Sequence, residues 1–275
     1  MTKITTLVEN SQGEHLALRN EHGISFFVEK DGHEILFDTG QSDAFIYNAS
    51  QLKIDLSRVG HVVLSHGHYD HTGGFRYLPE LTTDFELTLG TGFFEEKYGY
   101  RNNSYEYLGN NFDEDFLKSH HISYEFVDTQ RTEIVPGVYV ITRFERANED
   151  EVVNSRFRVR RDGDFVKDEF YDEVLLAVDT PKGMVVILGC AHPGMRNMLD
   201  TVKDLFDRPI FAVLGGTHLV EARGEALDHS IDYLQREEIE VIGVSHCTGE
   251  KMMEHLSTSN ERYYHNRTGS SLIIE

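Results

Sequence analysis

The sequence predicts an α/β protein with the architecture of a four-layer αββα sandwich, in which two sheets pack together and helices cover their outer faces. Three observations predict this class. Strand patterns dominate the first part of the chain, strands alternate with helical patterns in the second part, and several apolar runs are continuous enough for burial on both faces. The chain has 275 residues, of which 39% are hydrophobic, so a single domain spanning residues 1–275 can form a substantial core.

The first part of the chain has the pattern of an antiparallel sheet. Strands are expected at residues 5–8, 24–29 and 34–38, and Lys30-Asp31-Gly32 is typical of the turn between the last two. Residues 43–51 follow an Asp-Thr-Gly turn and are expected to form a helix. The remaining strands of this kind are expected at residues 138–143, 173–179 and 271–274.

Four apolar runs share one design, because each is short, rich in aliphatic side chains and ends in small residues. These predicted buried strands span residues 60–65, 184–189, 211–216 and 241–245. A histidine follows the end of each run, in the order His66, His192, His218 and His246. Loops at one end of a sheet commonly carry ligands and catalytic groups, so these histidines are candidates for a common site.

Helical periodicity separates the later strands, and helices are expected at residues 195–206, 227–237 and 250–256. Two regions fit this scheme less well. Residues 92–127 are rich in Tyr, Phe, Asn and acidic side chains and are a candidate for a cap inserted over the site. Residues 144–172 are highly charged and are predicted to form an exposed hairpin or a mobile loop that turns at Asp162-Gly163.

The chain is strongly acidic, with 26 Lys and Arg against 47 Asp and Glu and a net charge of −21. Nucleic acids and anionic membranes need cationic partners, so we expect neither, and we expect a small-molecule substrate. An anionic substrate is compatible with this charge when a bound metal dominates locally. The two cysteines provide no disulfide framework, and the sequence has no secretory signal pattern or membrane-length apolar run, so we expect a soluble, cytoplasmic protein.

The densest chemical motif is SHGHYDHTGG at residues 65–74, directly after a predicted strand. It places His66, His68, Asp70 and His71 within six residues. Imidazole nitrogens and carboxylate oxygens are ligands of Zn²⁺, Mn²⁺ and Fe²⁺. In a tight turn alternate residues can point the same way, so His66 and His68 can hold one metal while Asp70 and His71 face a second. The sequence therefore predicts two divalent ions, with Zn²⁺ expected and Mn²⁺ or Fe²⁺ also compatible.

HGHYDH resembles the HxHxDH signature of the metallo-β-lactamase fold superfamily, which includes β-lactamases, glyoxalase II, lactonases and RNA-processing nucleases. Phe37-Asp38-Thr39-Gly40 is similar to the family's early Asp-Thr-Gly element, whose aspartate supports the metal loop. GCAHPG, GGTHL and SHCTG, at residues 189–194, 215–219 and 245–249, resemble the later motifs of one branch. That branch is labelled as metal-dependent hydrolases or as dihydropterin–ribofuranosyl-aminobenzene phosphate synthase-like proteins, and the resemblance covers nearly the whole chain.

The resemblance implies two sets of metal ligands. They are His66, His68 and His192 for one metal, and Asp70, His71 and His246 for the other. The superfamily commonly adds an aspartate that bridges the metals, whereas Cys190 stands where that residue is expected. Two assignments stay open. Either His192 is the third histidine ligand of the first metal, or Cys190 takes the place of the aspartate that bridges the two metals. The departure also leaves open whether one ion or two are bound.

Asp70 and His218 are the candidate catalytic residues. Asp70 can orient the attacking water or shuttle a proton, while His218 can contact substrate, stabilise an oxyanion, act as a ligand or cap the next segment. Cys190 and Cys247 are individually more typical of small buried apolar side chains than of ligands. Other candidates are ambiguous. Four tyrosines can line a pocket or simply pack, namely Tyr98, Tyr100, Tyr105 and Tyr107. Four arginines can attract an anionic substrate, although a solvated face is favoured for them, namely Arg156, Arg158, Arg160 and Arg161. His120 and His121 are expected at the surface.

The motifs together predict a metal-dependent hydrolase that uses a metal-bound hydroxide to attack an ester, phosphodiester, thioester or lactone. The sequence has no Gly-x-Ser-x-Gly elbow, P-loop or dinucleotide fingerprint. Three alternatives remain. The resemblance also implies a pterin-related synthase that forms a C–N bond on the same metal site. A di-iron redox protein is disfavoured because no flavin domain fits in the chain, and a catalytically silent metal-binding protein is the third.

Overall fold

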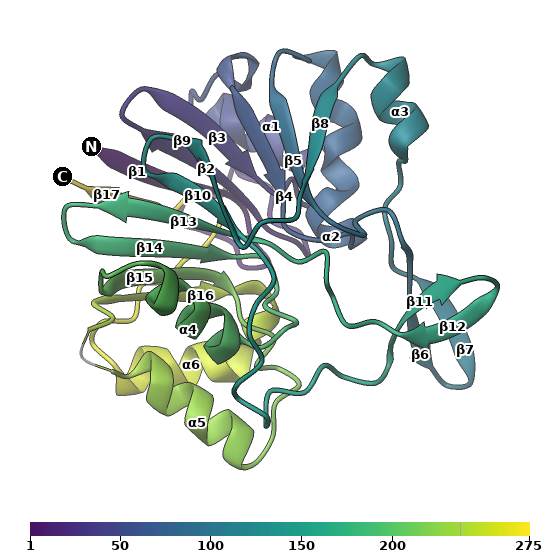
Figure 1. The fold of residues 1–275 in the computed structure, drawn as a ribbon. Helices are drawn as coiled ribbons and strands as arrows, with labels where there is room; N and C mark the ends of the chain where they lie inside the picture. The colour runs from purple at the N-terminus through teal and green to yellow at the C-terminus, as the bar shows by residue number, and fades with distance from the viewer. Residues whose placement is uncertain (237) are drawn as a thin grey trace.

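Two large sheets and one small sheet organise the chain in the computed structural model, which describes every residue except residue 237 (Figure 1). The first large sheet contains, in spatial order, β17 (Ser271–Ile274), β1 (Thr2–Val8), β2 (Ser25–Lys30), β3 (His33–Phe37), β4 (His61–Leu64), β5 (Glu86–Gly90) and β8 (Ser123–Val127). The second contains β16 (Val241–Ser245), β15 (Ile210–Gly216), β14 (Gly183–Leu188), β13 (Leu175–Thr180), β10 (Val138–Ile141) and β9 (Arg131–Val135). The small sheet contains β12 (Asp164–Lys167), β11 (Phe157–Arg161), β6 (Glu96–Arg101) and β7 (Ser104–Tyr107).

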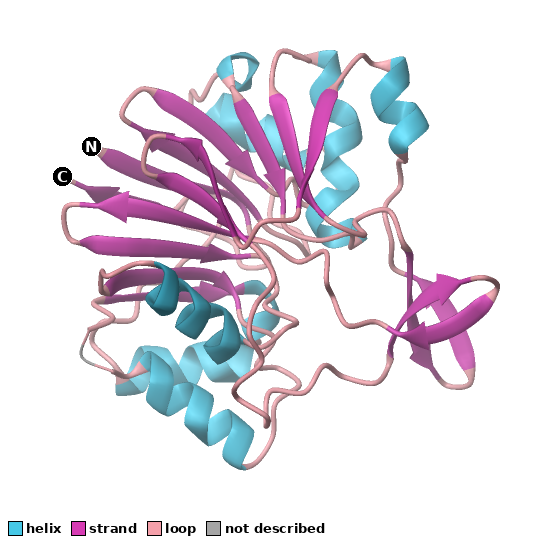
Figure 2. Ribbon diagram, viewed as in Figure 1, coloured by secondary structure: helices cyan, strands magenta, loops and turns pink. Residues whose placement is uncertain are grey.

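Helices lie outside the two large sheets (Figure 2). On the side of the first sheet these are α1 (Ala44–Gln51), α2 (Tyr69–Thr72) and α3 (Glu114–Ser119), and on the side of the second they are α4 (Met195–Leu205), α5 (Glu225–Leu234) and α6 (Glu250–Ser259). Short 3-10 helices span Leu56–Arg58, Gly73–Glu80 and His246–Thr248. The predicted αββα sandwich is confirmed. No helix among the described residues is long and apolar enough to cross a membrane.

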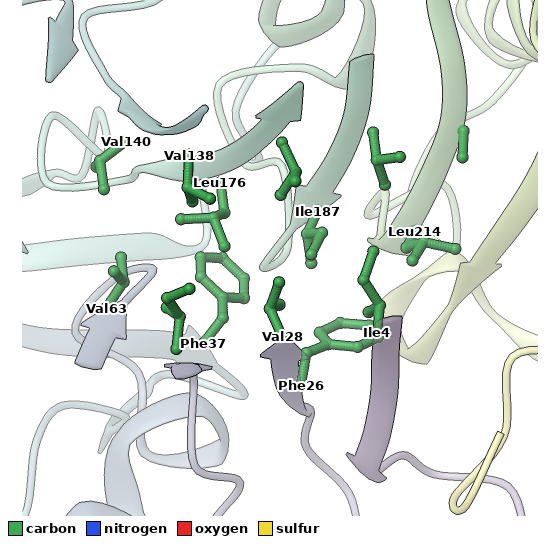
Figure 3. Close-up of a cluster of buried hydrophobic side chains, with 14 of the residues drawn as sticks. Ile4, Phe26, Val28, Phe37, Val63, Val138, Val140, Leu176, Ile187 and Leu214 are labelled. Carbon is green, nitrogen blue, oxygen red and sulfur yellow. The ribbon is translucent and has the colours of Figure 1, made fainter. Parts of the chain in front are cut away.

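An apolar layer between the two large sheets forms the central core (Figure 3). Strand alternation explains how each sheet supplies two cores at once. Phe26 and Val28 of β2 point into the layer between the sheets, while Phe27 packs under the helices of the first sheet. In the same way β14 sends Ile187 into the central layer and Val186 toward its own helices. These strands are therefore apolar on both faces, as their continuous apolar runs predict.

Parallel pairing brings the carboxyl ends of the central strands to one edge of the molecule. β3, β4 and β5 pair in parallel in the first sheet, as do β14, β15 and β16 in the second. The loops after these strands therefore lie close together, although they come from distant parts of the sequence. Those loops carry the histidines singled out in the sequence.

Most predicted elements are confirmed within a few residues, and the strands at 241–245 and 271–274 have the predicted bounds. The helix expected at 227–237 covers Glu225–Leu234, and residue 237 itself lies outside the described residues. β5 and β9 were not expected from the sequence. Residues 92–127, the candidate cap, divide between two sheets: β6 and β7 join the small sheet, whereas β8 extends the first large sheet.

The hairpin expected within residues 144–172 is confirmed, because β11 and β12 pair in antiparallel fashion. Its turn residues Asp162 and Gly163 have φ angles of 52° and 90°, the left-handed pair that favours Asp-Gly in a two-residue hairpin. β11 also pairs with β6. The two regions that fit the sequence pattern poorly thus form one small sheet, which projects beside the body of the sandwich (Figure 1).

Candidate metal centre

The metal loop begins where β4 ends and runs into the short helix α2. Its two first histidines turn toward each other, with 3.0 Å between Nε2 of His66 and Nδ1 of His68. Gly67 lies between them at a point of very close packing, because a Cβ there would stand 2.4 Å from the carbonyl oxygen of Phe93. The glycine therefore allows the tight turn that brings both imidazoles to one side.

The first His-rich group contains His66, His68 and His192, whose ligand atoms lie within 4.8 Å of one another. All three are buried, and Nε2 of His192 has no hydrogen-bond partner among the described residues. Burial lowers the pKa of each of these histidines well below its ordinary value. The imidazoles are therefore neutral at physiological pH, which is the form that binds a metal. A buried nitrogen without a partner in such a cluster fits a divalent ion.

A second group forms around Asp70, one of whose carboxylate oxygens lies 3.2 Å from Nε2 of His22 and 3.4 Å from Nε2 of His246. His246 is buried and its Nε2 makes no hydrogen bond within the described part of the chain. Burial acts to raise the pKa of Asp70, but His71, His22 and His246 outweigh it and hold this pKa well below its ordinary value. His22 comes from the loop between β1 and β2 and was not expected from the sequence, since an isolated histidine carries no motif.

His71 lies between the two groups. Its Nε2 is 3.8 Å from Asp70 and 3.2 Å from Sγ of Cys190, and with His66 and Cys190 it forms a third cluster within 4.8 Å. Burial acts to lower the pKa of His71, but the carboxylates of Asp70 and Asp38 raise it to about 9. The structure thus brings together all six ligands that the resemblance implies, with His71 nearer to Cys190 than to Asp70.

Asp38 holds the metal loop in place, as the Asp-Thr-Gly element implies. Its carboxylate accepts hydrogen bonds of 2.7 Å from the backbone N–H of Ser65, from the Ser65 hydroxyl and from Nδ1 of His71. Asp38 itself has a φ angle of 57° and is fully buried. The contact to Nδ1 fixes the ring of His71 with Nε2 directed at the cluster.

Asp38→Asn is expected to weaken metal binding by about 10- to 100-fold, because the amide NH₂ would face groups that need an acceptor. Competition with a chromophoric chelator, using Zn²⁺ on metal-free protein, measures this change. The matched control is Asp55→Asn, since Asp55 is an exposed side chain that caps the 3-10 helix Leu56–Arg58 and belongs to none of the candidate metal clusters in the described structure. Equal affinities in wild type and Asp38→Asn would show that Asp38 does not orient the metal loop.

The loop after β14 is held by Glu173, a residue that the sequence did not single out. Its carboxylate accepts the backbone N–H of Ala191 at 2.6 Å and of His192 at 2.9 Å. Burial raises the pKa of Glu173 to about 8. Ala191 has a φ angle of 58°, so this carboxyl group stabilises a strained turn that presents His192 to the cluster.

His246 is fixed from the other end of the chain. Glu9 accepts the backbone N–H of His246 at 2.7 Å, and Oδ1 of Asn10 lies 2.8 Å from its Nδ1. Both residues directly follow β1. The only sequence signal for them is an acidic residue at the end of an apolar strand, which is too common to mark a site.

A buried charge network connects the small sheet to the metal loop. Nζ of Lys97 in β6 donates to Asp168 at 2.7 Å and to Asp172 at 2.9 Å, and Asp172 also accepts the N–H of Gly67 at 2.9 Å. Burial acts to lower the pKa of Lys97, but the two aspartates outweigh it and raise this pKa. The network positions the turn between His66 and His68.

The His-rich groups open into a cleft of about 630 Å³. Residues of the small sheet, of α6 and of the loops that follow strands of the two large sheets line it, including Arg101, Arg156, Phe157 and Glu221. Arg156 pairs with Glu221 at 2.8 Å and stacks on Phe157. The sequence favours a solvated face for Arg156 and leaves attraction of an anionic substrate as the alternative, whereas the structure places Arg156 in the cleft wall.

His218 lies at the wall of this cleft. Its ring centroid is 4.4 Å from that of His192, and its Nδ1 is 3.5 Å from a carboxylate oxygen of Glu221. Its backbone has a φ angle of 53°, and its N–H donates to Sγ of Cys247 at 3.2 Å. Burial lowers the pKa of His218 to about 4. The structure therefore places a neutral imidazole next to the first His-rich group.

The remaining candidates lie apart from the metal centre. Tyr98, Tyr107, Tyr105 and Phe165 pack against one another on the small sheet, and Tyr105 stacks on Phe165 with centroids 3.7 Å apart. Packing is thus the role that the structure shows for these tyrosines. His120 and His121 are exposed, as expected.

The αββα sandwich and the buried His-rich groups at the seam between its sheets define a metal-dependent α/β enzyme. Residues 20–109 match the family model of the metallo-beta-lactamase superfamily. The chain is also 32% identical over 248 residues to an uncharacterized protein of Methanocaldococcus jannaschii, with 89% of this chain and 90% of that relative covered. The chain belongs to the metallo-β-lactamase superfamily.

Two further relatives differ in what their names state. The 7,8-dihydropterin-6-methyl-4-(β-D-ribofuranosyl)-aminobenzene-5′-phosphate synthase of Methanocaldococcus jannaschii is 28% identical over 285 residues, covering 95% of this chain and 94% of that protein. A crystal structure described as a metal-dependent hydrolase of the β-lactamase superfamily is 29% identical, with a TM-score of 0.86. The alignment covers 100% of this chain and 99% of that one. The alignment with the crystal structure therefore includes the loops that form the candidate centre.

Proposed function

We propose that this protein is a metal-dependent hydrolase that cleaves an ester, thioester, lactone or phosphodiester bond in a small anionic substrate. The observation that carries the proposal is the buried cluster of His66, His68 and His192, of which His68 and His192 line the cleft. His66, His68 and His192 would hold one ion, and Asp70, His71 and His246 would hold another, with His22 as an additional ligand candidate. Divalent ions in such a site polarise the scissile group and make a water nucleophilic near neutral pH.

Asp70 and His218 supply the proton chemistry of this proposal. Asp70 has a low pKa, so its carboxylate is charged and can accept a hydrogen bond from the attacking water. The neutral ring of His218 faces Glu221 through Nδ1, so an N–H there can donate to the carboxylate and leave Nε2 as an acceptor. His218 can in this state take a proton at Nε2 and return it to the leaving group.

The anionic character of the substrate is inferred from Arg101. This side chain lines the cleft from the end of β6, and no ion pair involves it within the described residues. Arg156 is already paired with Glu221, so Arg101 is the cleft arginine available to a substrate carboxylate or phosphate.

Arg101→Ala is expected to raise KM for an anionic substrate by about 10-fold while leaving kcat nearly unchanged, because one charge-assisted hydrogen bond is lost from ground state and transition state alike. Steady-state kinetics on a hydrolysed substrate measures this split. The control is Arg160→Ala, which removes a partly exposed arginine of β11 that pairs with Glu96. An unchanged KM in Arg101→Ala would remove the argument for an anionic substrate.

The proposed hydrolase is tested with protein loaded with Zn²⁺ or Mn²⁺ and a panel of phosphodiesters, thioesters, esters and lactones. Turnover that disappears on chelation and returns with metal supports the proposal. Bound metal without turnover of any member favours the synthase reading or a silent metal-binding protein instead.

A pterin-related synthase is the second candidate, because the synthase of Methanocaldococcus jannaschii is similar over 95% of this chain. The same ligands and cleft would suit a synthase, since divalent ions that activate a leaving group for hydrolysis can also activate one for attack by an amine. Mass spectrometry of products formed from a reduced pterin that carries a leaving group and an aminobenzene riboside phosphate separates the two activities. A new C–N bonded product would overturn hydrolysis as the main activity.

A further inference from the structure

Cys190 lies between the candidate metal positions. Its Sγ is within 4.8 Å of ligand nitrogens of His66 and His71, and within 4.8 Å of those of His246 together with Sγ of Cys247. The contact to Nε2 of His71 is 3.2 Å. Cys190 therefore belongs both to the cluster with His66 and His71 and to the cluster with His246 and Cys247, and its side chain is buried.

The backbone geometry brings this sulfur close to the metal loop. A Cβ on Gly189 would stand 2.2 Å from Oγ of Ser65 and 3.4 Å from Nδ1 of His66, so the strand end packs directly against the loop. The N–H of Cys190 donates to Glu173 at 3.3 Å, which adds to the two bonds that fix Ala191 and His192.

The side chains that could bind the two ions include few negatively charged donors. Among the described ligands, Asp70 is the one carboxylate in the clusters, and the other donors are histidines and cysteines. Nε2 of His246, in the cluster with Cys190, is buried without a hydrogen-bond partner in the described structure, which points independently to a bound ion. Two divalent ions facing one carboxylate favour a further negative ligand between them, and a thiolate is a strong ligand of zinc.

We propose that Cys190 is a metal ligand whose sulfur is shared by both ions, in the place where relatives of this fold use a carboxylate. The inference rests on the metal centre of the proposed function. The thiol proton leaves to solvent as the sulfur binds, and no oxidation or reduction takes place. Cys247 is a neighbour of this ligand, since its Sγ receives the N–H of His218 and contacts the carbonyl oxygen of Cys190.

Cobalt substitution tests the proposal, because a Co²⁺ ion bound by sulfur gives a ligand-to-metal charge-transfer band in the near ultraviolet. Metal-free protein is titrated with Co²⁺, and both the band and the number of ions bound are recorded. Wild type is expected to bind two ions and show the band. Cys190→Ala should lose the band and bind both ions about 10- to 100-fold more weakly. Cys190→Asp should lose the band yet keep both ions, because a carboxylate replaces the bridge.

Cys247→Ser is the matched control, since it removes the other sulfur of the cluster, and it should keep the band and both ions. A band that survives in Cys190→Asp, or disappears in Cys247→Ser, would overturn the proposal. So would two bound Co²⁺ ions without a band in wild type. Failure of wild type to bind any Co²⁺ would overturn the metal centre as well, which separates the two proposals. Circular dichroism of each metal-free variant checks that the fold is retained.

Discussion

His66→Ala is expected to lower kcat/KM for a hydrolysed substrate by about 10³-fold or more, equivalent to about 4 kcal/mol of lost transition-state stabilisation. His66 belongs to two of the candidate clusters and is fully buried beside His68. Its removal leaves the first group with two imidazoles, which is too few to hold an ion tightly at a three-histidine site. Elemental analysis of the purified variant should therefore show a loss of bound metal in parallel with the loss of activity.

The matched control is His120→Ala, which removes an exposed histidine of the first half of the chain. It should retain metal and activity. If His66→Ala bound as much metal as wild type, the ligand assignment would be wrong, whatever happened to the rate. Loss of activity with metal retained would instead assign His66 to substrate contact.

Lys97→Met is expected to destabilise the fold by about 3–5 kcal/mol, because it leaves two buried carboxylates without their cation. Lys97 and its partners Asp168 and Asp172 are each no more than 2% exposed. Methionine fills a similar space, so the loss reflects charge rather than volume. Urea unfolding of the metal-free variant, compared with metal-free wild type, measures the difference.

The same variant should also bind metal more weakly, since Asp172 fixes the N–H of Gly67 between His66 and His68. Lys118→Met provides the control, because the ion pairs of Lys118 in the described structure, with Glu114 and Asp115 on α3, are exposed. It should leave both stability and metal affinity close to wild type. A small effect of Lys97→Met on stability would mean that the aspartates are protonated or solvated in its absence.

The large sheets could be predicted because their strands carry strong local patterns. Continuous aliphatic runs such as residues 241–245 are buried on both faces, and each run is followed by a histidine that the parallel pairing brings to one edge. The small sheet could not be predicted in the same way. β6 and β11 are partly exposed and lie far apart in the sequence, so nothing local indicates that they pair.

The candidate centre was accessible from sequence only where residues form a dense motif. His66, His68, Asp70 and His71 stand together in one loop, so their chemistry is visible without a structure. His22 and the buried acids Glu9 and Glu173 are isolated in the sequence and become part of the centre only through folding. The substrate class stays a prediction, because Arg101 and the rest of the cleft wall come from the small sheet, from α6 and from loops that are distant in the sequence.

The packing of the two large sheets also sets the distances between the ligand side chains of the centre. His66 and His68 follow a strand of the first sheet, and His192 follows a strand of the second. The distance from the first two histidines to the third therefore depends on the thickness of the apolar layer around Phe37 and Ile187. Metal–nitrogen bonds tolerate changes of only about 0.2 Å. Adding or removing a methyl group in that layer, which contains no ligand, would therefore change the spacing of the ligands and the size of ion that fits between them. The preference for one metal would then depend on the hydrocarbon core as well as on the histidines.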